Sequence, residues 1–220
     1  MADNLPTHAR TVIIGGGSIG TNTAYHLTRL GHTDVVVLEQ GQLTSGTTWH
    51  AAGLIVAGLL TSEAECAIYT HGRELYANLE RETGIATGFR DVGYLQIATN
   101  EERLHEMRRV AAFMRRFGIN NHEVSVREAQ QMFPIGDLSD IVGAFLIPED
   151  GRANPVDVTT SLARGARNGG ARILEGVRVE EILAKNATVT GVRTANGQVI
   201  NAENVVICGG MWSRQLGARH

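Results

Sequence analysis

A glycine-rich segment that follows an apolar run most limits what this chain can fold into. Residues 12–14 are apolar, and Gly15, Gly17 and Gly20 then give the spacing G-x-G-x-x-G. Residues 19–30 continue with the apolar spacing of a helix. A strand, a turn of this kind and a helix in succession predict the first half of a parallel α/β unit that binds a dinucleotide.

Each glycine of this fingerprint has a mechanical role in such a unit. Gly15 lets the chain turn sharply out of the first strand, and Gly17 lets the backbone approach a pyrophosphate. Gly20 lets the helix pack close to the strand. We expect the pyrophosphate to lie over the N–H groups of Ser18 and Ile19, because the first turn of a helix is its positive end.

A second apolar run, residues 35–38, ends at the acid Glu39, and Gln40 comes next. Glu39 follows the fingerprint at the required spacing of about 20 residues. We expect its carboxylate to accept hydrogen bonds from the adenosine ribose hydroxyls. Its charge repels a 2′-phosphate and so disfavours NADP. The alternative is a glycine-rich turn in an unrelated α/β unit, which would not require the strand, helix and acid in this order.

Composition sets further limits on the chain. Its 220 residues suffice for one large domain or one and a half. A net charge of −3 gives no electrostatic case for nucleic acid or an anionic membrane. Cys66 and Cys208 fit no metal-binding spacing, so we expect no metal and a reducing compartment. Residues 1–10 lack a signal-peptide core, and residues 51–60 are too short to span a bilayer. We therefore expect a cytoplasmic protein.

The apolar patterning predicts an α/β fold that is interrupted once. A parallel α/β stretch comes first, an α+β stretch is inserted, and a second α/β stretch ends in a small antiparallel meander, with Asn196-Gly197 as a hairpin turn. The expected helices are 19–30, 62–83, 101–117, 126–132 and 156–168. The expected strands are 10–14, 34–38, 93–98, 141–147, 172–174, 178–183, 188–194, 198–201 and 204–207.

Flavin-binding and NAD-binding domains share the first fingerprint, so the fingerprint does not distinguish them. The loop after Glu39 does. Residues 44–54 read Thr-Ser-Gly-Thr-Thr-Trp-His-Ala-Ala-Gly-Leu. Small residues and hydroxyl groups allow a backbone to pass close to a long ligand and to donate hydrogen bonds to it. The late meander and a strand that ends in Gly209-Gly210 also favour a flavin.

With these residues the chain resembles the FAD-dependent amine oxidoreductases of the D-amino-acid oxidase class, and most of all the dimethylglycine and sarcosine dehydrogenases. The segments that carry the resemblance are 45–54, 148–155 and 209–212. It implies a Rossmann-like FAD-binding domain formed by 1–85 and 151–220, with 86–150 as an inserted part of a substrate domain.

The resemblance also implies how the loop would hold the cofactor. In that family the histidine of the Thr-Trp-His segment bonds covalently to the 8α-methyl carbon of the flavin, and His50 occupies its position. Ser45, Gly46 and Thr47 are expected along the pyrophosphate and ribityl chain. The alternative for His50 is a histidine that packs beside a non-covalent flavin.

Three later residues complete the implied cofactor contacts. The backbone of Val179 is expected to meet the adenine edge, and Gly209 and Gly210 let the cofactor pass near the edge of the sheet. Family members often have alanine and a small residue before the last glycine, where this chain has Cys208 and Gly209.

The implied activity is oxidation of a secondary or tertiary amine, such as dimethylglycine or sarcosine, by hydride transfer to FAD. A non-catalytic subunit, similar to the regulatory subunit of pyruvate dehydrogenase phosphatase, is the alternative, and an NAD-dependent dehydrogenase is a third hypothesis.

The chain ends at His220, where the family continues, so we expect a fragment or a poor enzyme by itself. No catalytic base is assigned. The amine, the electron acceptor and a partner chain that completes the site stay open.

Overall fold

The computed structural model describes residues 5–58 and 60–218, which fall into two units. The first unit contains 5–52, 79–87 and 154–218, and the second contains the described residues of 53–78 together with 88–153. The sequence assigned residues 53–78 to the first domain. The structure groups them with the second unit, where Ala57 and Cys66 are buried beside Met114 and Ile147.

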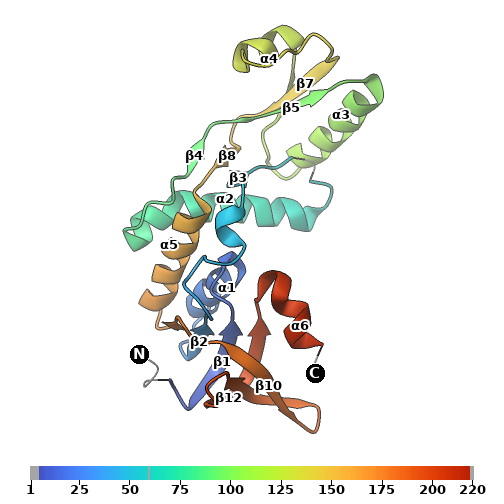
Figure 1. The fold of residues 1–220 in the computed structure, drawn as a ribbon. Helices are drawn as coiled ribbons and strands as arrows, with labels where there is room; N and C mark the ends of the chain where they lie inside the picture. Colours follow the sequence, from blue (N-terminus) through green and yellow to red (C-terminus); the bar gives the residue numbers. More distant parts are fainter. Residues whose placement is uncertain (1–4, 59, 219–220) are drawn as a thin grey trace. The chain divides into compact units, whose positions relative to one another are not determined.

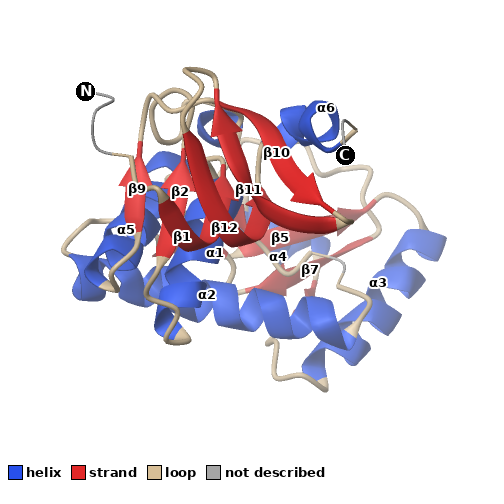
Figure 2. Cartoon of the chain, turned by 90° about the horizontal axis from the view of Figure 1, so that it is seen from below, coloured by secondary structure: helices blue, strands red, loops and turns tan. Residues whose placement is uncertain are grey.

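The first unit is built on one mixed sheet with the strand order β10-β11-β12-β1-β2-β9 (Figure 2). Strands β12, β1, β2 and β9 are parallel, and β10, β11 and β12 form an antiparallel meander. This arrangement confirms the predicted α/β fold class. The strands are β1 (His8–Ile14), β2 (Val35–Leu38), β9 (Arg172–Leu174), β10 (Val179–Lys185), β11 (Thr188–Thr194) and β12 (Val199–Ile207).

Both faces of the central strands are buried, as expected for parallel strands that are covered on two sides. Helices α1 (Ser18–Arg29) and α5 (Pro155–Asn168) pack against each other. Gly165 allows their close approach, because a Cβ there would lie 2.7 Å from the ring of Tyr25. A cluster of side chains from the parallel strands and the meander forms a core: Ala9, Val12, Ile14, Val36, Leu38, Ile182, Val192, Ile200 and Ala202.

Strand β12 corrects one prediction. The sequence suggested two strands, 198–201 and 204–207, with Ala202 and Glu203 between them. The structure has one strand, Val199–Ile207, which pairs with β11 at its start and with β1 from Asn201 onward. Glu203 and Asn204 are exposed, so the polar residues mark a solvent-facing stretch of the strand and not a break.

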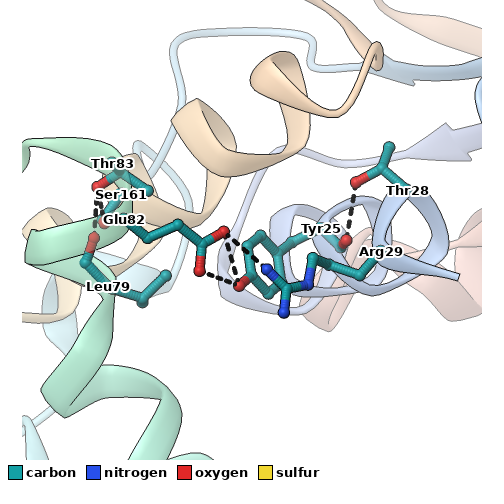
Figure 3. A network of polar contacts seen from close by, with 7 residues as sticks. All are labelled: Tyr25, Thr28, Arg29, Leu79, Glu82, Thr83 and Ser161. Carbon is teal, nitrogen blue, oxygen red and sulfur yellow. Dashed lines mark hydrogen bonds and ion pairs between the residues drawn. The ribbon is translucent and has the colours of Figure 1, made fainter.

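A polar network joins the end of helix α2 (Glu63–Thr83) to α1 and α5 within the first unit (Figure 3). The Tyr25 hydroxyl donates to both carboxylate oxygens of Glu82, at 3.0 and 2.8 Å. Burial and this bond raise the pKa of Tyr25 to about 12. The hydroxyls of Thr83 and Ser161 are 2.7 Å apart. These contacts hold the last residues of α2 (labelled in Figure 1) in the first unit, so the boundary between the units falls inside this helix.

The second unit contains two antiparallel sheets of three strands, in the orders β3-β8-β4 and β5-β7-β6. Strand β8 lies between the expected strand 141–147 and the expected helix 156–168, where the sequence predicted no element. Two-residue strands have no detectable period, so β3, β4 and β8 were missed. The elements are β3 (Leu54–Ile55), β4 (Arg90–Asp91), β5 (Tyr94–Ala98), α3 (Glu101–Arg115), β6 (His122–Val124), α4 (Val126–Met132), β7 (Gly143–Ile147) and β8 (Gly151–Arg152).

Strand β7 packs on a helix at each face. Phe145 joins the apolar stripe of α3, and Ala144 joins Ala129 of α4 in a separate cluster. Asn100 caps the start of α3, since its side chain accepts a hydrogen bond from the Arg103 N–H at 2.8 Å. The apolar stripe of α3 is buried and consists of Leu104, Met107, Ala111 and Met114.

A buried carboxylate fastens the turn before β8. Asp150 has no exposed surface. It accepts one hydrogen bond from the Tyr69 hydroxyl and one from the Ala57 N–H, at 2.9 Å. Burial raises the pKa of Asp150, and these two bonds oppose the rise. Burial and the bond to Asp150 also raise the pKa of Tyr69. The carboxylate therefore joins α2, the β3 segment and β8 of the second unit.

We expect Asp150→Ala to destabilise the second unit by about 2–6 kcal/mol, because it leaves the Tyr69 hydroxyl and the Ala57 N–H unpaired, at about 1–3 kcal/mol each. Urea unfolding followed by circular dichroism measures the loss. The matched control is Asp137→Ala, since Asp137 is exposed and accepts a hydrogen bond from the Ser139 N–H within its own turn. Equal losses in the two variants would contradict a structural role for Asp150.

Candidate functional site

The turn between β1 and α1 is closely packed. Gly15 has φ +115°, and a Cβ on it would lie 2.3 Å from the carbonyl oxygen of Cys208 at the end of β12. A Cβ on Gly20 would lie 1.9 Å from the carbonyl oxygen of Gly15. Real Cβ atoms do not approach backbone so closely, so both positions require glycine for the fold itself. Packing of strand, turn and helix therefore accounts for two of the three fingerprint glycines.

Gly17 differs from the other two fingerprint glycines. Its φ of −80° and ψ of −173° suit any residue, and a Cβ on it would meet only the Thr48 hydroxyl oxygen, at 3.1 Å. Gly17 at the N-cap has no side chain with which to cap α1, and no acid lies in the first turn. The Ser18 N–H, which the sequence predicted beneath the pyrophosphate, instead donates to the Thr48 hydroxyl at 3.1 Å. Ser18 and Ile19 in that turn are exposed. The exposed first turn at this positive helix end fits a pyrophosphate. A Cβ on Gly17 would also press on the Thr48 hydroxyl, so the fold favours glycine here, though less strictly than at the other two fingerprint glycines.

The Glu39 side chain is fastened beside this turn. One carboxylate oxygen accepts from the Gly16 N–H at 2.7 Å, and the other accepts from the Gly41 N–H at 2.8 Å. The Glu39 carbonyl oxygen also accepts from the Val177 N–H at 2.8 Å. A carboxylate has about four acceptor positions, so ribose hydroxyls could still be bound. Gln40, the next predicted contact, is exposed.

The loop after β2 is anchored through a threonine that the sequence did not single out. Thr48 is buried, and its hydroxyl oxygen accepts from the Ser18 N–H at 3.1 Å. It begins the short 3-10 helix η1 (Thr48–His50). Its neighbour Thr47, which the sequence did single out, is exposed, as are Ser45 and Gly46. Two adjacent threonines look alike in a sequence, and only the fold separates the anchor from the exposed hydroxyl.

The turn after β12 lies beside the same loop. A Cβ on Gly210 would lie 3.6 Å from the Thr47 hydroxyl, and one on Gly46 would lie 3.6 Å from the ring of Trp212. Gly209 precedes the 3-10 helix η2 (Gly210–Trp212), which leads into α6 (Ser213–Gly217). The carboxyl ends of β1, β2 and β12 therefore bring the predicted glycines of all three segments to one edge of the sheet, where α/β proteins bind ligands.

His50 is exposed and lies against its neighbour Trp49. The ring centroids are 3.7 Å apart and the ring planes are inclined by 34°. Val179 is more remote from the other predicted contacts. It is half-buried at the start of β10 opposite Thr194. It is connected to the site through Val177, two residues earlier, whose N–H donates to the Glu39 carbonyl oxygen.

Within the described residues, no three His, Cys, Asp or Glu side chains gather as a metal site. None of the helices in that part of the chain combines the length and the apolar character needed to cross a bilayer. Cys66 and Cys208 are both free thiols.

Residues 10–220 match the family described as FAD dependent oxidoreductase (DAO). The chain belongs to this family, as the sequence predicted. It is 39% identical to human mitochondrial sarcosine dehydrogenase over 219 residues, 97% of this chain and 24% of that protein. It is 37% identical to the mouse mitochondrial pyruvate dehydrogenase phosphatase regulatory subunit over 213 residues, with shares of 97% and 24%.

The fold is similar to the crystal structure of L-proline dehydrogenase from P. horikoshii. The TM-score is 0.89 at 29% identity, and the match covers 97% of this chain and 56% of that one. The chain thus spans about a quarter of the length of the two curated relatives and about half of the length of this structural neighbour.

Proposed function

We propose that this chain binds FAD across the carboxyl ends of β1, β2 and β12 and forms the cofactor-binding part of an amine oxidoreductase. The observation that supports the proposal is the exposed first turn of α1 beside Gly17, which has no acid in it and lies at the same sheet edge as the turn after β12. Family membership supports FAD over NAD as the dinucleotide. Bound FAD would supply a two-electron acceptor for a hydride from an amine carbon.

Different residues would bind different parts of FAD. The α1 N-terminus would hold the pyrophosphate, and Glu39 would accept from the adenosine ribose. Ser45, Gly46 and Thr47 would lie along the ribityl chain, and Gly209 and Gly210 would allow the cofactor close to the sheet edge. We further propose that His50 forms a covalent bond to the flavin. Its exposed imidazole in a loop anchored at Thr48 supports this assignment.

The proposed substrate class is a secondary or tertiary amine of the N-methylglycine type, and the human sarcosine dehydrogenase relative supports it. The other candidate function is that of a regulatory subunit, which the mouse relative supports at similar identity. Adding sarcosine or dimethylglycine to the anaerobic yellow chain separates the two. Bleaching of the flavin absorbance supports an oxidoreductase and contradicts a purely regulatory role. We also propose a cytoplasmic location, with a partner chain that completes the site.

We expect Gly17→Ala to raise the dissociation constant for FAD at least about tenfold, a loss of 1.4 kcal/mol, because the added methyl group occupies the space of the pyrophosphate. The melting temperature of the cofactor-free chain should fall only slightly, since alanine suits this backbone and its Cβ would press on one side-chain atom, the Thr48 hydroxyl oxygen at 3.1 Å. Fluorescence titration with FAD and thermal unfolding measure the two effects. Unchanged FAD affinity would contradict the placement of the pyrophosphate at Gly17.

A further inference from the structure

Trp49 is a large aromatic side chain that burial does not explain. Its exposed fraction is 58%, so most of its surface contributes nothing to the core of the first unit. Its ring instead lies on the imidazole of His50, with centroids 3.7 Å apart and planes inclined by 34°. The main contact that the structure gives this indole is therefore with the side chain that would carry the flavin.

The backbone of His50 is held independently of that contact. Its N–H donates to the Thr47 carbonyl oxygen at 3.2 Å, and the Ala51 N–H donates to the Thr48 carbonyl oxygen at 3.1 Å. The Thr48 hydroxyl accepts from the Ser18 N–H at the start of α1. The main chain of η1 is thus fixed to the helix. These hydrogen bonds fix the main chain only, so the imidazole of His50 can still rotate about its Cα–Cβ and Cβ–Cγ bonds.

We propose that Trp49 is a positioning residue for the covalent attachment of FAD to His50, and that its indole holds the imidazole in one orientation. This rests on the proposed function, namely FAD bound at this site with His50 as its point of attachment. A reacting group held in one orientation reacts faster than a freely rotating one. An aromatic pair has enough interaction energy to change such a rate about three- to tenfold.

The attachment reaction balances with dioxygen as the oxidant. A bond forms between an imidazole nitrogen of His50 and the 8α carbon, while one C–H bond of the methyl group breaks. The imidazole and the methyl group each lose one proton, and two electrons pass to the isoalloxazine ring. Dioxygen then takes two electrons and two protons and leaves as hydrogen peroxide. Trp49 takes no part in the bond changes, so it affects the rate and not the product.

The test follows covalent flavin with time after saturating FAD is added to the cofactor-free chain in air. Acid precipitation separates covalent from released flavin, and a fluorescence titration gives the non-covalent affinity. We expect Trp49→Ala and Trp49→Leu to attach flavin about three- to tenfold more slowly than the wild type at equal occupancy. Trp49→Phe, which keeps an aromatic ring, should stay within about twofold. Leucine keeps apolar bulk without a ring.

Each outcome decides a separate point. Equal rates in all four chains overturn the role of Trp49 and leave attachment at His50 intact. A Phe variant as slow as the Ala variant overturns ring stacking as the cause. A wild-type chain that binds FAD but never attaches it overturns both the attachment and the role of Trp49.

In the NMR spectrum of the cofactor-free chain, the stacked indole should shift the ring proton resonances of His50 upfield, and Trp49→Ala should abolish that shift.

Discussion

Replacing Gly20 by alanine is expected to destabilise the first unit by about 3 kcal/mol or more, the upper end of the cost of overpacking. The new methyl group would lie 1.9 Å from the Gly15 carbonyl oxygen and 3.4 Å from the Cys208 Cβ. The first of these atoms belongs to the backbone of the turn, which cannot move without shifting α1 from β1. The midpoint of urea unfolding reports the loss.

The matched control is Gly72→Ala, a second glycine inside a helix. Gly72 lies in α2, and a Cβ on it would meet nothing within 4 Å. Alanine is a better helix former than glycine, so this variant should gain about 0.5–1 kcal/mol. The two substitutions are chemically identical and should shift the unfolding midpoint in opposite directions. A Gly20→Ala chain as stable as the wild type would show that α1 does not pack on the turn as described.

Replacing His50 by alanine is expected to abolish covalent flavin completely while the chain still binds FAD. The reason is chemical, since alanine has no nucleophilic atom and the pyrophosphate and ribose contacts are made by other residues. After acid precipitation, all the yellow colour of the variant should be in the supernatant, whereas that of the wild type should stay in the pellet.

The control for this experiment is His8→Ala. His8 is an exposed histidine of the same unit, at the start of β1, and lies 3.6 Å from Asp34. It should keep its covalent flavin. If the His50 variant also retained flavin in the pellet, another residue would be the point of attachment.

The parts of the fold that the sequence predicted are those fixed by local rules. The fingerprint glycines, the helix that follows and Glu39 are set by the geometry of one strand–helix–strand unit, and α1 and β2 end within a residue or so of the expected bounds. The hairpin at Asn196-Gly197 formed as predicted, with Gly197 at φ +85° and its N–H bonded to Thr194.

The parts that the sequence missed depend on contacts between distant residues. Strand β8 exists because Gly151 packs against the backbone of Arg90, where a Cβ would lie 2.1 Å from a carbonyl oxygen. Thr48 is the anchor of the cofactor loop only because Ser18 lies opposite it. Gly16 takes part in the site because its N–H reaches Glu39. The run of three glycines was a signal for Gly16, but no signal separated Thr48 from Thr47.

Native mass spectrometry of the chain after incubation with FAD, and in parallel with NAD, tests the central claim most directly. The α1 N-terminus beside Gly17 and the loop anchored at Thr48 predict one FAD per chain and no retained NAD at the same concentration. A chain that keeps NAD and not FAD, or that keeps neither dinucleotide, would contradict the account.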